Sequence, residues 1–321
     1  MRTDSPASTA PPPAPRPTDD RPSVDLRQRV HDSPKERAIK YMLGACALVS
    51  VMTTLGIAAV LLWESIGFFW EVPLWRFFTD TQWTPQFADK HFGIWPLLTG
   101  TLLITGIAAL VALPLGLASA IYIAKYAPRA IRAWLKPSLE LLAGVPTVVY
   151  GYFALTFVTP LLKTVIPSLG VFNALSAGFV VGVMIIPMVA SLSEDAIQAV
   201  PAELEEGGYA LGATKFEVIL QIILPAAFSG IIASFILAVS RAIGETMIVT
   251  LAAGATPKLT LDPTESIQTM TAFIVQIGKG DVSQFSIQYK SLFAVGLMLF
   301  IITLSMNVVA NRVVRRYREQ Y

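Results

Sequence analysis

Two charged residues interrupt an apolar run in the C-terminal third of the chain. Arg241 and Glu245 lie four residues apart within FSGIIASFILAVSRAIGETMIVTL, so we expect them on one face of a helix. A guanidinium group binds oxyanions such as phosphate and sulfate bidentately, so Arg241 could receive an anion, with Glu245 holding Arg241 when the site is empty. The hydroxyl groups of Ser240, Thr246 and Thr250 could add hydrogen bonds to that anion.

A charge near the centre of a bilayer costs about 3 kcal/mol on insertion scales, so both side chains need partners. One interpretation is a structural ion pair that joins helices. The other, which we favour, is a solute pathway lined by Ser240, Arg241, Glu245 and Thr246, in which the solute supplies part of the compensation. The two interpretations differ for the double neutral variant, which keeps transport only if the pair is structural.

A polar stretch, ELEEGGYALGATKFEVILQIILP, separates two apolar runs at residues 203–225. Its small residues allow another protein to approach the backbone closely, and Gly212 can adopt the positive φ of a sharp turn. We therefore expect a short helix, a turn at Gly212 and a second helix over residues 215–224. The residues that we expect to dock a partner protein are Glu206, Gly207, Gly208, Ala210 and Gly212.

Composition indicates a polytopic membrane protein: 54% of the 321 residues are hydrophobic and 14% are charged, with a mean hydropathy of +0.60. The net charge of +2 does not favour nucleic acid. Cys46 is the single cysteine, and His31 and His91 belong to no metal-spaced cluster, so we expect no disulfide, metal or cofactor. The phosphate-binding motif GxxxxGK[ST] is absent, so we expect neither ATP hydrolysis nor a catalytic residue in this chain.

Six apolar runs are long enough to cross a bilayer of about 30 Å, which takes roughly 20 helical residues. Because backbone polar groups in lipid must be satisfied locally, we predict an all-α fold of six transmembrane helices. Pro114, Pro146 and Pro187 are expected to bend the second, third and fourth of these helices. The six runs cover residues 41–63, 95–123, 137–161, 174–192, 226–251 and 291–309.

Basic residues set the expected orientation. They cluster before the first run, in the loop at residues 125–136 and after the last run, which favours cytoplasmic termini and a cytoplasmic polar loop at about residues 201–225. Residues 1–38 are rich in proline and small polar residues, and we expect a disordered cytoplasmic tail there, followed by one transmembrane domain over residues 39–321.

Two segments on the opposite side carry apolar patterns of their own. Residues 64–93 are rich in aromatic side chains, which suits either a belt at the membrane interface or a contact with another protein. Apolar residues recur at helical spacing over residues 263–278, which predicts a short amphipathic helix at the outer face. We expect this helix to be a plug or packing element rather than a ligand site.

The polar stretch resembles the cytoplasmic coupling loop of ABC importer permeases. Glu206, two small residues, Gly212 and an I-x-L-P ending at Pro225 match the family spacing, although Gly207 and Gly208 stand where the family usually has alanines. The run RAIGETM at 241–247 then resembles the phosphate-specific permeases of ABC importers, the PstC type. ELLAGVPTVVYGY at 140–152 and IYIAKYAP at 121–128 are similar to the same family, and the resemblance runs from about residue 65 to the C-terminus.

This resemblance implies a permease domain of the type I ABC importer architecture in a bacterial cytoplasmic membrane, moving inorganic phosphate. It also implies three kinds of partner: two ATP-binding subunits seated on the coupling loop, a second, related permease subunit of the PstA type, and an extracytoplasmic phosphate-binding protein. The family's intramembrane Arg and Glu match Arg241 and Glu245.

Several alternatives stay open at this point. Sulfate and molybdate permeases share Arg-x-x-Gly-Glu but typically continue with Phe-Gly, where this chain has Thr246 and Met247. An ion-driven secondary transporter or a channel would have no need of a coupling loop. A sensory subunit that signals phosphate status without transport is a further alternative.

Overall fold

The structure is a computed structural model that describes residues 34–283 and 285–317. Most of the tail expected over residues 1–38 lies outside these residues, and the first helix, α1 (Pro34–Phe69), already includes the last part of that range. The chain divides into two units, with the boundary inside α1 between Leu55 and Gly56. The described part of the first unit is the beginning of α1, whose side chains are exposed from Glu36 onward.

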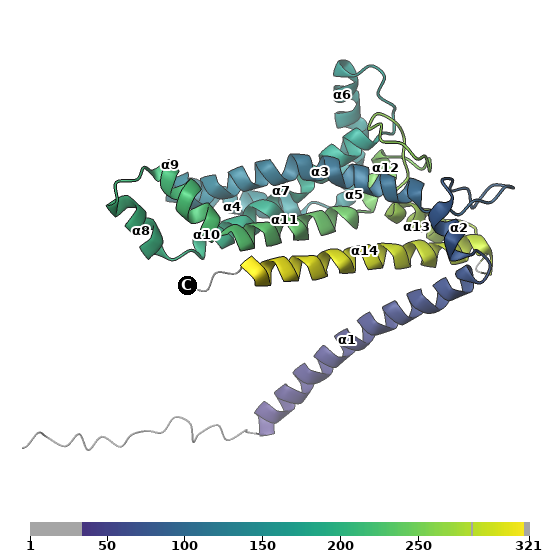
Figure 1. Cartoon of the computed structure of the whole chain (residues 1–321), viewed down its shortest axis with the longest axis horizontal. Helices are drawn as coiled ribbons and strands as arrows, with labels where there is room; N and C mark the ends of the chain where they lie inside the picture. Colours follow the sequence, from purple (N-terminus) through teal and green to yellow (C-terminus); the bar gives the residue numbers. More distant parts are fainter. Residues whose placement is uncertain (1–33, 284, 318–321) are drawn as a thin grey trace, which may run out of the picture. The chain divides into compact units, whose positions relative to one another are not determined.

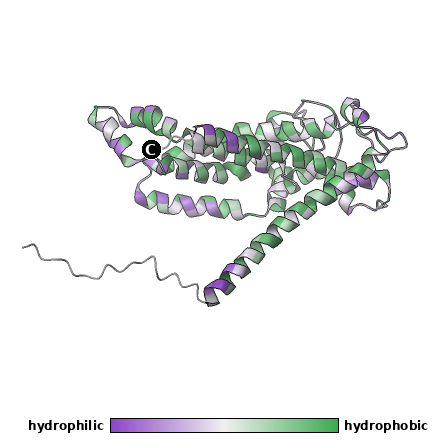
Figure 2. Cartoon of the chain, turned by 60° about the horizontal axis from the view of Figure 1, so that its bottom comes forward, coloured by the Kyte–Doolittle hydropathy of each residue, from purple (hydrophilic) through white to green (hydrophobic). Residues whose placement is uncertain are grey.

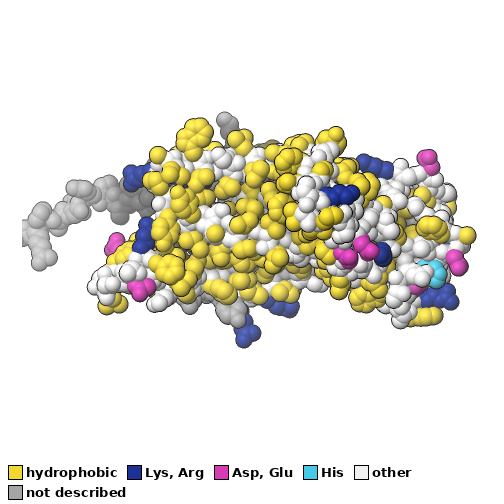
Figure 3. All heavy atoms as spheres, turned by 90° about the horizontal axis from the view of Figure 1, so that it is seen from above, with side chains coloured by type: hydrophobic (Ala, Val, Ile, Leu, Met, Phe, Trp, Pro, Cys, Tyr) yellow, Lys and Arg dark blue, Asp and Glu magenta, His cyan; other side chains and the backbone are white. Residues whose placement is uncertain are grey.

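The second unit is built on α3 (Trp95–Ile121) and α7 (Ala174–Gln198), which pack closely against each other. Glycine makes this approach possible: a Cβ at Gly178 would lie 2.8 Å from Cβ of Ile107. α11 (Phe228–Ile243) packs on α7 and on α14 (Ile287–Tyr317) (Figure 1). Figure 2 shows mainly hydrophobic residues along these helices, and hydrophobic side chains cover most of the face seen in Figure 3.

Within residues 34–283 and 285–317, five helices are long and apolar enough to cross a membrane, and a bent pair of helices gives a sixth if the pair is counted as one span. This confirms the predicted all-α membrane fold. The spans are Glu36–Phe69, Trp95–Tyr126, Thr147–Val165, Ala174–Gln198 and Ile287–Val313, and the bent pair is Lys215–Ala226 with Phe228–Ile243.

The third span begins at Thr147, so the prediction that it begins at residue 137 was wrong. Residues 129–144 form a separate amphipathic helix, α4 (Arg129–Gly144), with no fully buried residue. Val145 and Pro146 are extended, because proline disfavours helical backbone in the residue before it, and this separates the two helices. The span consists of α5 (Thr147–Phe153), the π-helical turn η3 (Ala154–Val158) and α6 (Thr159–Val165).

The fifth span, predicted as one helix over residues 226–251, is instead bent and broken. A helical segment made of α9 (Lys215–Val218), η4 (Ile219–Ile223) and α10 (Leu224–Ala226) meets α11 at an angle of 69°. α11 then ends at Ile243, and α12 (Met247–Ala252) begins after a short irregular segment. The interruption at residues 244–246 includes Glu245 and Thr246, two of the four residues predicted to line a pathway.

Aromatic residues form a hydrophobic core at the N-terminal end of α3. Phe68, Phe77, Trp83, Phe92 and Phe273 are buried there and meet edge to face, as in the Trp83–Phe273 contact at 5.0 Å. The predicted amphipathic helix is present as α13 (Met270–Lys279) and packs into this core, beside α2 (Leu74–Thr79). Other aromatic residues of the segment, including Trp70, Trp75 and Phe87, remain exposed.

The polar loop forms the predicted helix–turn–helix. α8 (Ala202–Ala210) ends at a turn in which Gly212 has φ of +83°, and Thr214 then caps α9 by a capping box with Glu217. Figure 1 shows α8 and α9 at one end of α3 and α7, and α12 and α13 at the other. The loop and the aromatic core therefore lie at opposite ends of the second unit.

Candidate functional site

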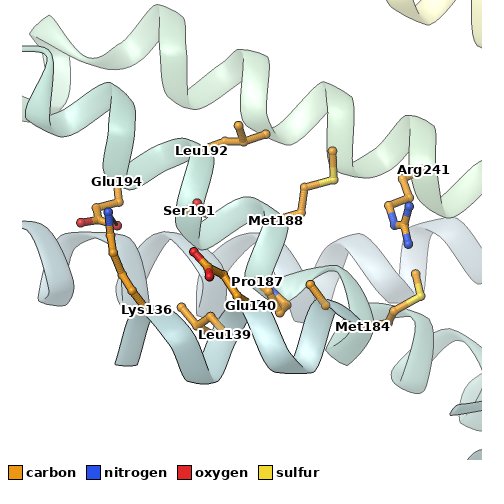
Figure 4. Close-up of a pocket in the computed structure, with 11 residues that line it drawn as sticks. Lys136, Leu139, Glu140, Met184, Pro187, Met188, Ser191, Leu192, Glu194 and Arg241 are labelled. Atoms are coloured by element: carbon orange, nitrogen blue, oxygen red, sulfur yellow. Dashed lines mark ion pairs between the residues drawn. The ribbon is translucent and has the colours of Figure 1, made fainter. Parts of the chain in front are cut away.

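A cavity of about 420 Å³ lies between α4, α7 and α11. Its wall is largely apolar on the α7 side, where Met184, Pro187 and Met188 contribute, and carries charges from each of the three helices. Figure 4 shows Arg241 at one end of the cavity and Glu194 beside Lys136 at the other, with Glu140 between them. An elongated cavity with cations at both ends can accommodate a small anion.

Arg241 lies in the last turn of α11 and its side chain is exposed toward the cavity. Among the residues that the structure describes, it forms no ion pair. The carbonyl groups at the C-terminal end of a helix favour a nearby cation, which supplies part of its compensation. The guanidinium donors remain available to a ligand.

Glu245 does not pair with Arg241, so the predicted ion pair is absent. The spacing of four residues brings two side chains together only within a continuous helix, and α11 ends at Ile243. The Glu245 side chain is 7% exposed and accepts hydrogen bonds from the backbone N–H groups of Met247 at 3.1 Å and Ile248 at 3.3 Å. It therefore caps the start of α12.

The remaining predicted pathway residues do not reach the cavity wall. The hydroxyl of Ser240 is buried and has no hydrogen-bond partner within the described part of the chain. Thr246 donates to the carbonyl oxygen of Gly244 at 3.1 Å, and Thr250 donates to that of Thr246 at 2.6 Å. Of the four residues predicted to line the pathway, the structure brings Arg241 alone to this cavity.

A buried carboxylate at the other end of the cavity escaped the sequence analysis. Glu194 of α7 is 1% exposed and is held by Arg132 at 2.6 Å, by Lys136 at 3.0 Å and by the side-chain amide of Gln198. A carboxylate this buried requires such partners, because the cost of removing its hydration is several kcal/mol. The available signal was an acidic residue at the end of an apolar run, together with two cations spaced four residues apart in α4.

The residues predicted to dock a partner protein divide into two groups. Glu206, Gly207, Ala210 and Gly212 are exposed, and added side-chain atoms at Gly207 would meet nothing within 4 Å. Gly208 is buried, and a Cβ there would lie 2.6 Å from Cδ1 of Ile222 in η4 and 3.0 Å from Cγ2 of Val218 in α9. Gly208 thus packs the loop internally, whereas the other four face outward.

Two contacts tie this loop to the end of the second span. Lys125, in the π-helical turn η2 (Tyr122–Tyr126), pairs with Glu205 of α8 at 2.6 Å between Nζ and Oε2. Lys215 lies over the ring of Tyr126, 4.7 Å from its centroid. These contacts join the loop to the residues that follow α3.

The sequence matches a family model described as a binding-protein-dependent transport system inner membrane component over residues 112–319. It is 33% identical over 291 residues to the probable ABC transporter permease protein YqgH of Bacillus subtilis (strain 168), covering 88% of this chain and 94% of that one. It is 33% identical to the phosphate transport system permease protein PstC of Xylella fastidiosa (strain Temecula1), over 75% of this chain and 78% of the relative. The PstC of Haemophilus influenzae is 31% identical, over 85% and 92% of the two chains.

The fold is also that of a solved transporter. The inward-facing MetNI methionine ABC transporter superposes with a TM-score of 0.52, covering 71% of this chain and 95% of that one. The identity is 17%, so this likeness supports the fold alone.

Proposed function

Because the chain belongs to the family of binding-protein-dependent transport system inner membrane components, we propose that it is the permease subunit of an ATP-driven importer for inorganic phosphate. The membrane permease assignment follows from the family. The phosphate assignment is supported by relatives named as phosphate transport permeases, at 31–33% identity over most of this chain.

The observation that carries this proposal is the unpaired Arg241 in the wall of the cavity. An arginine without an acidic partner inside a membrane protein needs compensation, and a phosphate ion supplies it through bidentate hydrogen bonds. The break after Ile243 leaves Arg241 at a helix end, where its guanidinium is free of the partner that the sequence suggested. In this proposal Glu245 holds the break in place by capping α12, and the anion meets Arg241.

The remaining parts of the importer come from other chains. An extracytoplasmic binding protein would deliver phosphate, and two ATP-binding subunits would dock on the exposed residues of the loop, Glu206, Gly207, Ala210 and Gly212. A second, related permease subunit would complete the pathway. Both termini and the coupling loop lie in the cytoplasm in this arrangement, as the basic residues favour.

The test is uptake of radiolabelled phosphate by the reconstituted complex, with excess sulfate or molybdate as competitor. Arg241→Gln should lower phosphate uptake by about tenfold to a hundredfold, the effect of losing hydrogen bonds to a charged group. Arg129→Gln is the matched control, because Arg129 is an exposed cation at the start of α4 outside the cavity. Normal uptake by Arg241→Gln would overturn the role of Arg241, equal competition by sulfate would redirect the assignment, and uptake without ATP would indicate an ion-driven transporter.

A further inference from the structure

The cations around Glu194 are only partly used by that carboxylate. Glu194 is sealed, with 1% of its side chain exposed, whereas the side chains of Arg132 and Lys136 remain 34% and 38% exposed. A guanidinium group carries five N–H donors and an ammonium group three, and each ion pair with Glu194 occupies one atom of the cation. Two cations and one carboxylate leave one net positive charge on these three side chains, and both cations are partly exposed.

The buried carboxylate makes this a preorganised site. Ion pairing to one fixed acceptor holds two flexible side chains in place, which lowers the entropy that a ligand must remove when it binds them. Arg132 and Lys136 are four residues apart, so both reach Glu194 from the same face of α4. Of the other acidic groups nearby, Glu140 lies one turn further along α4 and lines the cavity, and Asp195 follows Glu194 and is exposed.

Lys136 and Glu194 line the end of the cavity opposite Arg241, and Arg132 pairs with Glu194 from one turn earlier in α4, outside the lining. We infer that Arg132 and Lys136, positioned by Glu194, form a second binding site for a phosphate-type oxyanion where the cavity ends. This inference rests on the proposed function, because it places a second station for the transported anion along the same cavity. Glu140 lies between the two stations (Figure 4), where its negative charge would weaken retention and favour release.

One other source offers the same chemistry. α4 exposes 80% of Trp134 and 75% of Leu141, as expected for a helix at a membrane surface, so a phospholipid headgroup could occupy the site instead of free phosphate. The experiment must therefore present the two sources separately.

The test is the rate at which an amine-acylating reagent modifies Lys136 in the purified full-length chain, followed by peptide mass spectrometry. The chain is kept in a phosphorus-free maltoside detergent, and either inorganic phosphate or a short-chain phosphatidylglycerol is added, with sodium chloride at equal ionic strength as reference. At ten times the dissociation constant, phosphate should slow modification of Lys136 about tenfold. Lys125 and Lys258, which are paired with Glu205 and Glu265, report any general effect and should keep their rates.

Two variants make the result specific. Arg132→Gln removes the extra positive charge while leaving Lys136 paired with Glu194, so phosphate protection of Lys136 should be lost. Glu140→Gln removes an exposed negative charge without touching an ion pair, so it is not expected to disturb folding, and it should lower the phosphate concentration needed for protection several-fold.

Each outcome decides the matter. Protection by inorganic phosphate is expected for a station on the solute's path, whereas protection by the phospholipid alone would retain an oxyanion site but assign it to the membrane. Absence of protection by either, or protection unchanged in Arg132→Gln, would overturn the site. Arg241→Gln should keep the protection of Lys136, so failure here is distinguishable from failure of the uptake experiment.

Discussion

At the scale of single residues, Arg241 and Glu245 perform separate tasks, and this can be measured. Glu245→Ala removes two hydrogen bonds that cap α12 and should lower stability by about 1 kcal/mol, the usual effect of losing a helix cap. Because the two side chains form no ion pair, the change in Arg241→Gln/Glu245→Ala should equal the sum of the single changes within about 0.5 kcal/mol. Unfolding of the purified variants in denaturant provides the measurement. If the stability change of the double variant differs from the sum by more than about 1 kcal/mol, Arg241 and Glu245 do form an ion pair.

The same residues show where sequence reasoning reaches its limit. Arg241 could be selected because a charge in an apolar run is costly wherever it points. Its partner could not, since the four-residue spacing predicts a contact only if the helix continues, and α11 ends at Ile243. Glu194 pairs with Arg132, which lies 62 positions earlier in the chain, and with the nearby Lys136. No local sequence pattern specifies a pairing over that distance.

At the scale of elements, neighbouring glycines in α8 offer a matched comparison. Gly208→Val should disturb the packing of α8 on α9 by about 1–3 kcal/mol, because Val218 is fully buried and cannot move aside easily. Gly207→Val places the same side chain in open space and should leave the loop intact. Limited trypsin digestion at Lys215 reports the difference, with faster cleavage expected for Gly208→Val alone. Equal cleavage of both variants would show that Gly208 has no packing role.

Some helix boundaries can be predicted from composition alone, whereas others depend on the surrounding structure. The spans at Trp95–Tyr126 and Ala174–Gln198 follow directly from long apolar runs, and the turn at Gly212 follows from the freedom of glycine. The start of the third span could not be placed, because ELLAG and VPTVV are both apolar and hydropathy alone does not separate them. The amphipathic pattern of α4, with Arg132 and Lys136 on one face and Trp134 and Leu141 elsewhere, is the feature that distinguishes it from a span.

At the scale of the whole molecule, topology is the property that connects the sites to a direction of transport. The loop of α8 and α9 and the segment between α12 and α13 are separated in the chain by one bent pair of helices, which would place them on opposite sides of the membrane if the pair crosses it as one span. The distribution of basic residues favours a cytoplasmic position for the first of them, as we propose. The anion stations at Arg241 and at Arg132 and Lys136 would then be met in that order during import.

Two exposed leucines allow this orientation to be tested directly. Leu211, 90% exposed in the turn after α8, and Leu261, 77% exposed in the segment before α13, are replaced singly by cysteine in a Cys46→Ala background. A membrane-impermeant thiol reagent should modify the cysteine at position 261 in intact cells and the one at position 211 only after the cells are made permeable. Because both positions are highly exposed, a difference in labelling reports sidedness rather than burial. The reverse pattern would invert the topology and, with it, the order in which an imported anion meets the two stations.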